Sequence, residues 1–350
     1  MECDFCFEDS VFSETRERAG QRGQSYTAKQ CEPQWFHGGL SSDDVVEVHT
    51  ILKFRADLSY RQEDFEKAFK EYSECSALIP PGNNAMKRDV QESQARCLIH
   101  LGRPKEALEI TQMLTKGVSN TDHLTGVLHL QATIHNHLGN LQEEVSCLQQ
   151  LIALHPFNPH FWICLAECYM SLFLAITNCK EPSQSSHRFS LCPPRSLGAQ
   201  RCMKDIARTI DCSVCRDDNL VPGHCNASDS SLTIYTSEEQ LLTWSCASFI
   251  RARLLLQFIQ PQHASFVLEN NLKTQELIEG LLEKVGLLEE QKMLIVEVMG
   301  EDLLVERTKE EGQTDIKTTQ TLNSFIMTTD TDFKVRWFQK ITSLGSQSVV

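Results

Sequence analysis

The sequence predicts an all-α fold, a superhelix of stacked helix pairs interrupted by a disordered insertion. Apolar residues recur at helical spacing, with short breaks, from about residue 46 to residue 176. Four alanines within this stretch, at positions 56, 95, 132 and 166, are spaced by 39, 37 and 34 residues, which indicates an internal repeat. Between residues 177 and 235 the pattern is replaced by Ser, Pro, Cys and His, a composition that does not form a core.

Trp162, Leu165, Ala166 and Tyr169 follow the spacing of the tetratricopeptide repeat (TPR), with alanine in place of glycine. Pro156 lies six residues before Trp162, which is where that repeat closes its preceding unit. Counting back in the same frame places Gly139 at the turn between two helices, and Gly102 at the turn of the unit before. The predicted fold is therefore a TPR-like α-α superhelix, a helical-repeat solenoid.

The four alanines explain how the predicted helices pack. Two helices of a pair cross closely only if the residue at the crossing is small, while larger side chains fill the ridge between neighbouring pairs. The sequence holds three recognisable pairs and the first helix of a fourth, and about three stacked units are needed for a stable array. Glu144 and Ser59 depart from the pattern, since a small residue and an aromatic are expected there. The alternative is an irregular helical bundle.

The predicted organisation has five parts. Residues 1–45 form a largely flexible N-terminal leader, residues 46–176 the TPR-like repeats, and residues 177–235 a disordered linker or insertion rich in Ser, Cys and Pro. Residues 236–300 contain C-terminal helices that continue the array, beginning at a capping box over residues 237–240. Residues 301–350 contain an acidic loop and a terminal amphipathic helix with Trp337 and Ile341 on one face, capped by Asp332.

Composition restricts the class of partner. The chain has 350 residues, with 33 basic and 47 acidic side chains and a net charge of −14, which argues against generic binding to nucleic acid. No apolar run approaches the roughly 20 residues of a membrane helix, since Phe161–Ile176 contains Glu167. The N-terminus is acidic, whereas a secretory signal peptide begins with basic residues that an apolar run follows. Together with 15 cysteines interpreted as reduced thiols, this predicts a cytoplasmic protein, with the nucleus as a further compartment.

The first helix of each pair in a solenoid lines an inner, concave surface. At the corresponding positions the sequence places polar side chains of both charges, which predicts binding of a protein or peptide segment that also carries both. The predicted groove residues are Lys53, Asp57, Tyr60, Arg61, Asp89, Glu92, Arg96, His100, His129, Asn136, His137 and Glu167. Asp57 and Glu92 argue against the clamp with which some TPR domains hold a partner's two carboxylates. The alternative is that these residues are ordinary solvated side chains.

A second interpretation concerns zinc. Cys212 and Cys215, followed by His224 and Cys225, contain the elements of a zinc site and would make the insertion a zinc-dependent regulatory module. Adjacent His224 and Cys225 do not readily reach one ion, so we expect no metal there and unconstrained thiols instead. The sequence contains no Gly-rich phosphate loop, nucleophile elbow or zinc-protease motif, and we expect no cofactor. The predicted function is a non-enzymatic interaction scaffold or adaptor.

Five segments carry a resemblance to a known family. They are CEPQWF (31–36), AMKRDVQE (85–92), HPFNP (155–159), ASFIRARLLLQF (247–258) and EVMGED (297–302). They resemble the uncharacterised vertebrate protein family called chromosome eight open reading frame 76, and the resemblance runs along nearly the whole chain except the linker. It implies a TPR-like helical fold and no particular activity.

Overall fold

The computed structural model describes residue 36 and residues 45–180, 237–310 and 328–345. These residues form eleven α-helices and one 3-10 turn, and no strand occurs among them, which confirms the all-α prediction. All of the helices belong to one compact unit that begins at Ser42. The predicted flexible leader, apart from Phe36, and nearly all of the predicted insertion lie outside the described residues.

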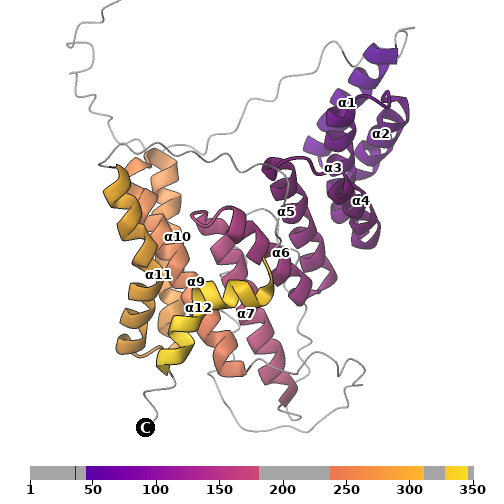
Figure 1. The fold of residues 1–350 in the computed structure, drawn as a ribbon. Coiled ribbons are helices and arrows are strands. Elements are labelled where there is room, and N and C mark those ends of the chain that lie inside the picture. Colours follow the sequence, from indigo (N-terminus) through magenta and orange to yellow (C-terminus); the bar gives the residue numbers. More distant parts are fainter. Residues whose placement is uncertain (1–35, 37–44, 181–236, 311–327, 346–350) are drawn as a thin grey trace, which may run out of the picture. The chain divides into compact units, whose positions relative to one another are not determined.

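Seven helices fill the predicted repeat region, and each packs against the next along the chain (Figure 1). They are α1 (Val45–Arg61), α2 (Phe65–Leu78), α3 (Asn84–His100), α4 (Pro104–Lys116), α5 (Thr121–Leu138), α6 (Leu141–Leu154) and α7 (Pro159–Lys180). Helix α3 also packs against α5, so the first helices of the second and third predicted pairs touch.

Four more helices follow the insertion. They are α9 (Glu238–Ile259), which continues into a 3-10 turn (Gln260–Gln262), α10 (Ser265–Val285), α11 (Glu289–Glu310) and α12 (Asp330–Gly345). Helix α9 packs against α7, α10 and α11, and α12 packs against α6, α9 and α11. Because α11 continues to Glu310, the acidic loop predicted from residue 301 does not exist over residues 301–310.

Two helix starts test the predicted caps. The capping box at α9 is confirmed, since Ser237 Oγ accepts from the Gln240 backbone N–H and Gln240 Oε1 accepts from the Ser237 backbone N–H, both at 3.2 Å. At α12 the cap is Thr329 rather than Asp332. Thr329 Oγ1 accepts from the Asp332 backbone N–H and donates to the Asp332 carboxylate, at 3.1 and 2.6 Å. Asp332 therefore lies in the first turn of the helix, and its carboxylate accepts from the Thr329 hydroxyl rather than from the backbone N–H that a capping box uses.

The three turns within the first three helix pairs share one backbone conformation. Gly102 and Gly139, at φ of 71° and 73°, are left-handed, and Glu63, at the equivalent repeat position, has φ of 63°. Glycine adopts this region readily, whereas a side chain there costs about 1–2 kcal/mol. The recurrence confirms that Gly139 lies at an inter-helix turn, and shows that the first pair tolerates a strained residue at this place.

Glu63→Gly should therefore raise the free energy of unfolding by about 0.5–1 kcal/mol, because the released strain exceeds the extra chain entropy of glycine. Urea unfolding followed by circular dichroism measures the change. Gln62→Gly is the matched control, since it adds the same entropy without relieving a positive φ. Equal free energies for the two variants would contradict this interpretation of the turn.

The alanines of the predicted crossings are buried. Ala56, Ala95 and Ala166 are 0% exposed and Ala132 is 6% exposed. Both departures from the pattern are buried as well, and hydrogen bonds accommodate them. Ser59 Oγ donates to Glu71 Oε2, and Glu144 Oε2 accepts from Asn136 Nδ2, each at 3.0 Å.

Ala166→Leu should overpack one crossing and cost about 1–3 kcal/mol of stability. Helix α9 comes close to Ala166, because buried Ser245 Oγ donates to the Ala166 carbonyl at 2.8 Å. Ala175→Leu, an exposed position on the same helix, is the control. Thermal unfolding should separate the two variants by several degrees, and indistinguishable midpoints would show that Ala166 is not at a tight crossing.

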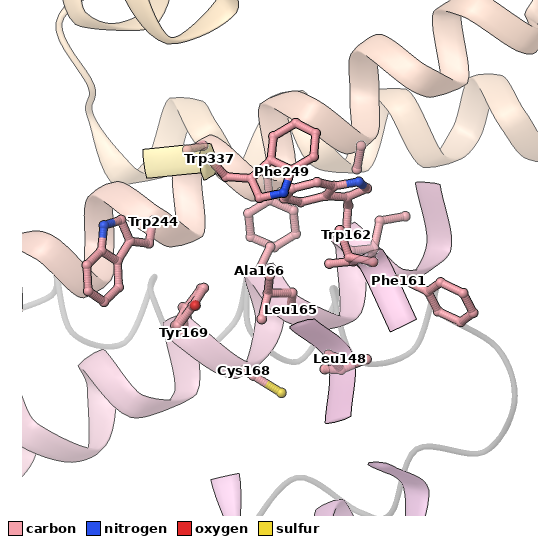
Figure 2. Packing of buried hydrophobic residues seen from close by; sticks show 14 of the residues in the cluster. Leu148, Phe161, Trp162, Leu165, Ala166, Cys168, Tyr169, Trp244, Phe249 and Trp337 are labelled. Atoms are coloured by element: carbon pink, nitrogen blue, oxygen red, sulfur yellow. The ribbon is translucent and has the colours of Figure 1, made fainter. Parts of the chain in front are cut away.

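The largest hydrophobic cluster joins α7 to the C-terminal helices (Figure 2). The ring of Trp162 lies 4.9 Å from that of Trp337 in an edge-to-face arrangement and 6.0 Å from that of Phe333. The ring of Trp244 stacks on Phe338 at 5.7 Å. These three α12 aromatics are at most 9% exposed, so the terminal helix is part of the core.

Helix α7 contains the 19-residue stretch Pro159–Thr177, which has the length and composition of a membrane-spanning helix. That is longer than the apolar run expected from the sequence. Half of the apolar window is buried inside the fold, where it packs against α6 and α9. A helix at the centre of a folded core has the same properties.

Candidate functional site

The predicted groove residues on α1 and α3 lie side by side. Lys53 Nζ is 3.0 Å from Asp57 Oδ2 on its own helix and 2.9 Å from Asp89 Oδ2 on α3. Closer to the C-terminal ends of these two helices, Tyr60 OH and His100 Nε2 form a hydrogen bond of 3.1 Å. Residues about 40 positions apart in the sequence therefore share one surface.

Lys53 supplies the positive charge at this end of the surface. Burial lowers the pKa of Lys53, but the hydrogen bonds to Asp89 and Asp57 outweigh it, so the pKa is raised and the ammonium stays charged. Tyr72 OH also donates to Asp57 Oδ1 at 2.6 Å. One cation is thus shared by two carboxylates, which leaves excess negative charge at this end of the surface.

Helix α5 continues the surface beyond α3. A Cβ atom on Gly126 would lie 3.8 and 3.9 Å from the two carboxylate oxygens of Glu92, so the two helices approach closely there. Glu92 is also 3.9 Å from Arg96 Nη2. Burial lowers the pKa of His129 on α5, and the Arg96 guanidinium lowers it further. We call the side of α1, α3 and α5 that carries Lys53, Asp57, Asp89, Glu92, Arg96 and His129 the polar face.

Imidazole rings occupy the C-terminal end of the polar face. His100 stacks on Phe65, with ring centroids 4.1 Å apart and planes 5° from parallel. Burial lowers the pKa of both His100 and His137, and His100 lowers that of His137 further. These rings are neutral at pH 7 and offer one donor and one acceptor each.

The lowered pKa values predict that the protein loses stability in mild acid. Above the ordinary histidine pKa of about 6.5 the imidazoles are neutral in both states; below it the unfolded chain binds protons first. Stability therefore falls as pH falls through that value. We expect the midpoint temperature of thermal unfolding to be lower at about pH 5.5 than at about pH 7.5. The difference between the two pH values should be smaller in the double variant His129→Asn/His137→Asn. Equal drops would mean that these rings do not carry the effect.

Three predicted groove residues remain, Arg61, Asn136 and Glu167. Arg61 is exposed at the end of α1. Asn136 Nδ2 donates to Glu144 of α6. Glu167 is only 1% exposed, because α7 packs against both α6 and α9, so the prediction that it faces a partner is wrong.

Sequence reasoning missed a buried cation in α9. Arg251 is 0% exposed, donates to the Met299 carbonyl at 2.6 Å, and forms a two-pronged ion pair with Asp302 at 2.5 and 2.8 Å. Its guanidinium carbon is 5.2 Å from the ring centroid of Trp337 and 6.0 Å from that of Trp162. The signal was a pair of arginines, Arg251 and Arg253, within the largely apolar segment ASFIRARLLLQF. The Arg251 guanidinium is enclosed, so its ion pair with Asp302 connects α9 to α11 and the arginine presents no open binding site.

The structure offers no metal centre within residues 45–180, 237–310 and 328–345, where no group of three or more His, Cys, Asp or Glu is arranged to hold an ion. The zinc candidates Cys212, Cys215, His224 and Cys225 lie outside these ranges. Burial raises the pKa of the Cys75 thiol to about 11 and those of Cys97, Cys147 and Cys246 to about 12. These thiols are protonated at neutral pH and pack as small apolar groups.

Fold and site together define an all-α protein in which successive helices pack along the chain and a polar face spans α1, α3 and α5. The chain belongs to a protein family of unknown function (DUF5588), whose model matches residues 3–345. It is 42% identical over 355 residues to the human "Uncharacterized protein C8orf76", covering 96% of this chain and 92% of the human protein. A rat homologue of the same name is 38% identical over 349 residues, with the same coverage. These relatives confirm the resemblance inferred from the five segments. No solved structure matches the chain.

Proposed function

We propose that this protein is a non-enzymatic scaffold or adaptor with a TPR-like solenoid, and that it binds a segment of a partner protein on the polar face of α1, α3 and α5. The supporting observation is that polar side chains of α1 and α3 meet on one surface, and that α5 approaches this surface closely. Lys53 contacts Asp89, and Glu92 approaches Gly126.

These two contacts occupy equivalent places in the repeat. Lys53 and Glu92 are 39 residues apart, and Asp89 and Gly126 are 37 apart, which are also the spacings of Ala56 to Ala95 and of Ala95 to Ala132. A contact that recurs at the repeat spacing is what a solenoid produces and what an irregular bundle does not. The regularity supports the TPR-like arrangement over the bundle.

The composition of the face favours a protein ligand. It has cations, carboxylates and neutral imidazoles within a few ångströms of one another, which suits a peptide with its own mixture of charges and backbone groups. With a net charge of −14, the chain is poorly suited to nucleic acid. We propose that the protein works in the cytoplasm, with the nucleus as a further compartment, and that it has a protein partner, no membrane partner and no cofactor.

Site-specific photo-crosslinking in cells tests the proposal. A photoreactive amino acid placed at Arg61 or Thr133, on first helices, should form covalent adducts with one common partner. The same group at Lys70 or Glu109, exposed on the second helices α2 and α4, is the control and should not capture that partner. Equal capture from both sets, or capture only from the second helices, would contradict the proposal.

A further inference from the structure

The charges along α3 have an order. Asp89, Glu92 and Arg96 lie on one side of this helix, at i, i+3 and i+7, with exposed side-chain fractions of 56%, 23% and 37%. The acidic residues come first and the arginine last. Seven residues at 1.5 Å per residue separate Asp89 from Arg96 by about 10.5 Å along the helix axis. The polar face thus has an acidic end and a basic end.

The acidic end can accept a cation. Two carboxylates, from Asp57 and Asp89, share the single ammonium of Lys53, and Glu92, one turn further along α3, has only a loose ion pair at 3.9 Å to Arg96. The nearby Arg88 is in contact with His123 of α5 instead. A lysine or arginine from a partner would offset the remaining negative charge.

The basic end can accept a carboxylate. Arg96 carries five N–H donors, and its ion pair with Glu92, at 3.9 Å, is near the outer limit for such contacts. The other groups close to it, Tyr60 and His129, are neutral at pH 7. A guanidinium in this state binds a single carboxylate in a two-pronged geometry, while Glu92 would repel a second one.

We infer that the partner segment carries a basic side chain that meets Asp89 and Glu92, and an acidic side chain that meets Arg96. This rests on the proposed function and adds to it the charge order of the ligand. In an extended segment about three residues span 10 Å, so the two charges would be three residues apart. In a helical segment they would be about seven residues apart.

Exchanging the two charges tests the inference. The variant Glu92→Arg/Arg96→Glu keeps the net charge and an oppositely charged i, i+4 pair, but it reverses the order of charge between positions 92 and 96, while Asp89 stays acidic. A random-peptide phage library would be selected against the full-length wild-type protein and, separately, against this variant. Circular dichroism and thermal unfolding would first establish that both proteins fold alike. If the exchanged protein fails to fold, Arg96→Gln alone replaces it.

We expect wild type to select peptides with the two charges at the stated spacing, and the exchanged protein to select peptides of opposite charge order. Each peptide should bind the other protein about tenfold or more weakly by fluorescence polarisation. Peptides selected by the wild-type protein should bind Arg96→Gln about tenfold more weakly than wild type. The same peptides with their acidic residue replaced should bind the two proteins equally. Peptides that compete for Thr133 crosslinking yet bind all variants equally would overturn the inference and leave the proposed function standing. Selection of no peptide for the polar face would overturn both.

Discussion

Trp162→Ala is expected to lower the free energy of unfolding by about 3–5 kcal/mol, the range for removing a large aromatic from a core. Trp162 is 0% exposed, packs edge to face on Trp337, and donates its indole N–H to the Pro156 carbonyl at 2.9 Å. Urea unfolding followed by circular dichroism measures the loss. Phe266→Ala removes an aromatic ring that is 72% exposed, and we expect it to change stability by no more than about 0.5 kcal/mol.

The loss at Trp162 should extend to the terminal helix. Because the ring contacts both Phe333 and Trp337, the variant should also speed amide hydrogen exchange in α12 more than in α1 or α2. Similar stability for Trp162→Ala and Phe266→Ala would show that the cluster in Figure 2 is not the core of the protein.

Asp302→Ala should cost about 3 kcal/mol, because it leaves the Arg251 cation buried without its carboxylate. The Met299 carbonyl and the surrounding aromatic rings remain, but they do not neutralise the charge. Asp302 itself is 41% exposed, so lost packing contributes little.

A double variant separates the charge effect from packing. Arg251→Met/Asp302→Ala removes both charges and places a flexible apolar side chain among the rings of Trp162, Trp337 and Phe157. We expect the double variant to be more stable than Asp302→Ala alone. Strictly additive losses for the two single changes would contradict the buried ion pair.

The features that sequence predicted are those with a local physical signal. Helical periodicity places the helices, the small residues predicted at crossings, such as Ala56 and Ala95, are buried, and the turn glycine at position 139 is left-handed. The same periodicity also predicted part of the polar face. Once first helices are adjacent, Lys53 and Asp89 fall within reach of each other.

The features that sequence did not predict depend on contacts between distant segments. Gln149 of α6 donates to Asp330 of α12 at 2.8 Å, across 181 residues, and no periodicity indicates that partner. Arg251 lay in a segment recognisable as a covered helix, but its carboxylate is in α11. Glu167 was misplaced for the same reason, because the helix that covers α7 comes after the insertion.

Hydrogen exchange on the complex tests the central claim most directly. The partner captured from Thr133 would be added to the full chain, and amide exchange compared with and without it. The proposed function predicts slower exchange in α1, α3 and α5, with α2 and α4 unchanged. Protection confined to α2 and α4, or to the helices after residue 237, would show that the partner does not bind the polar face.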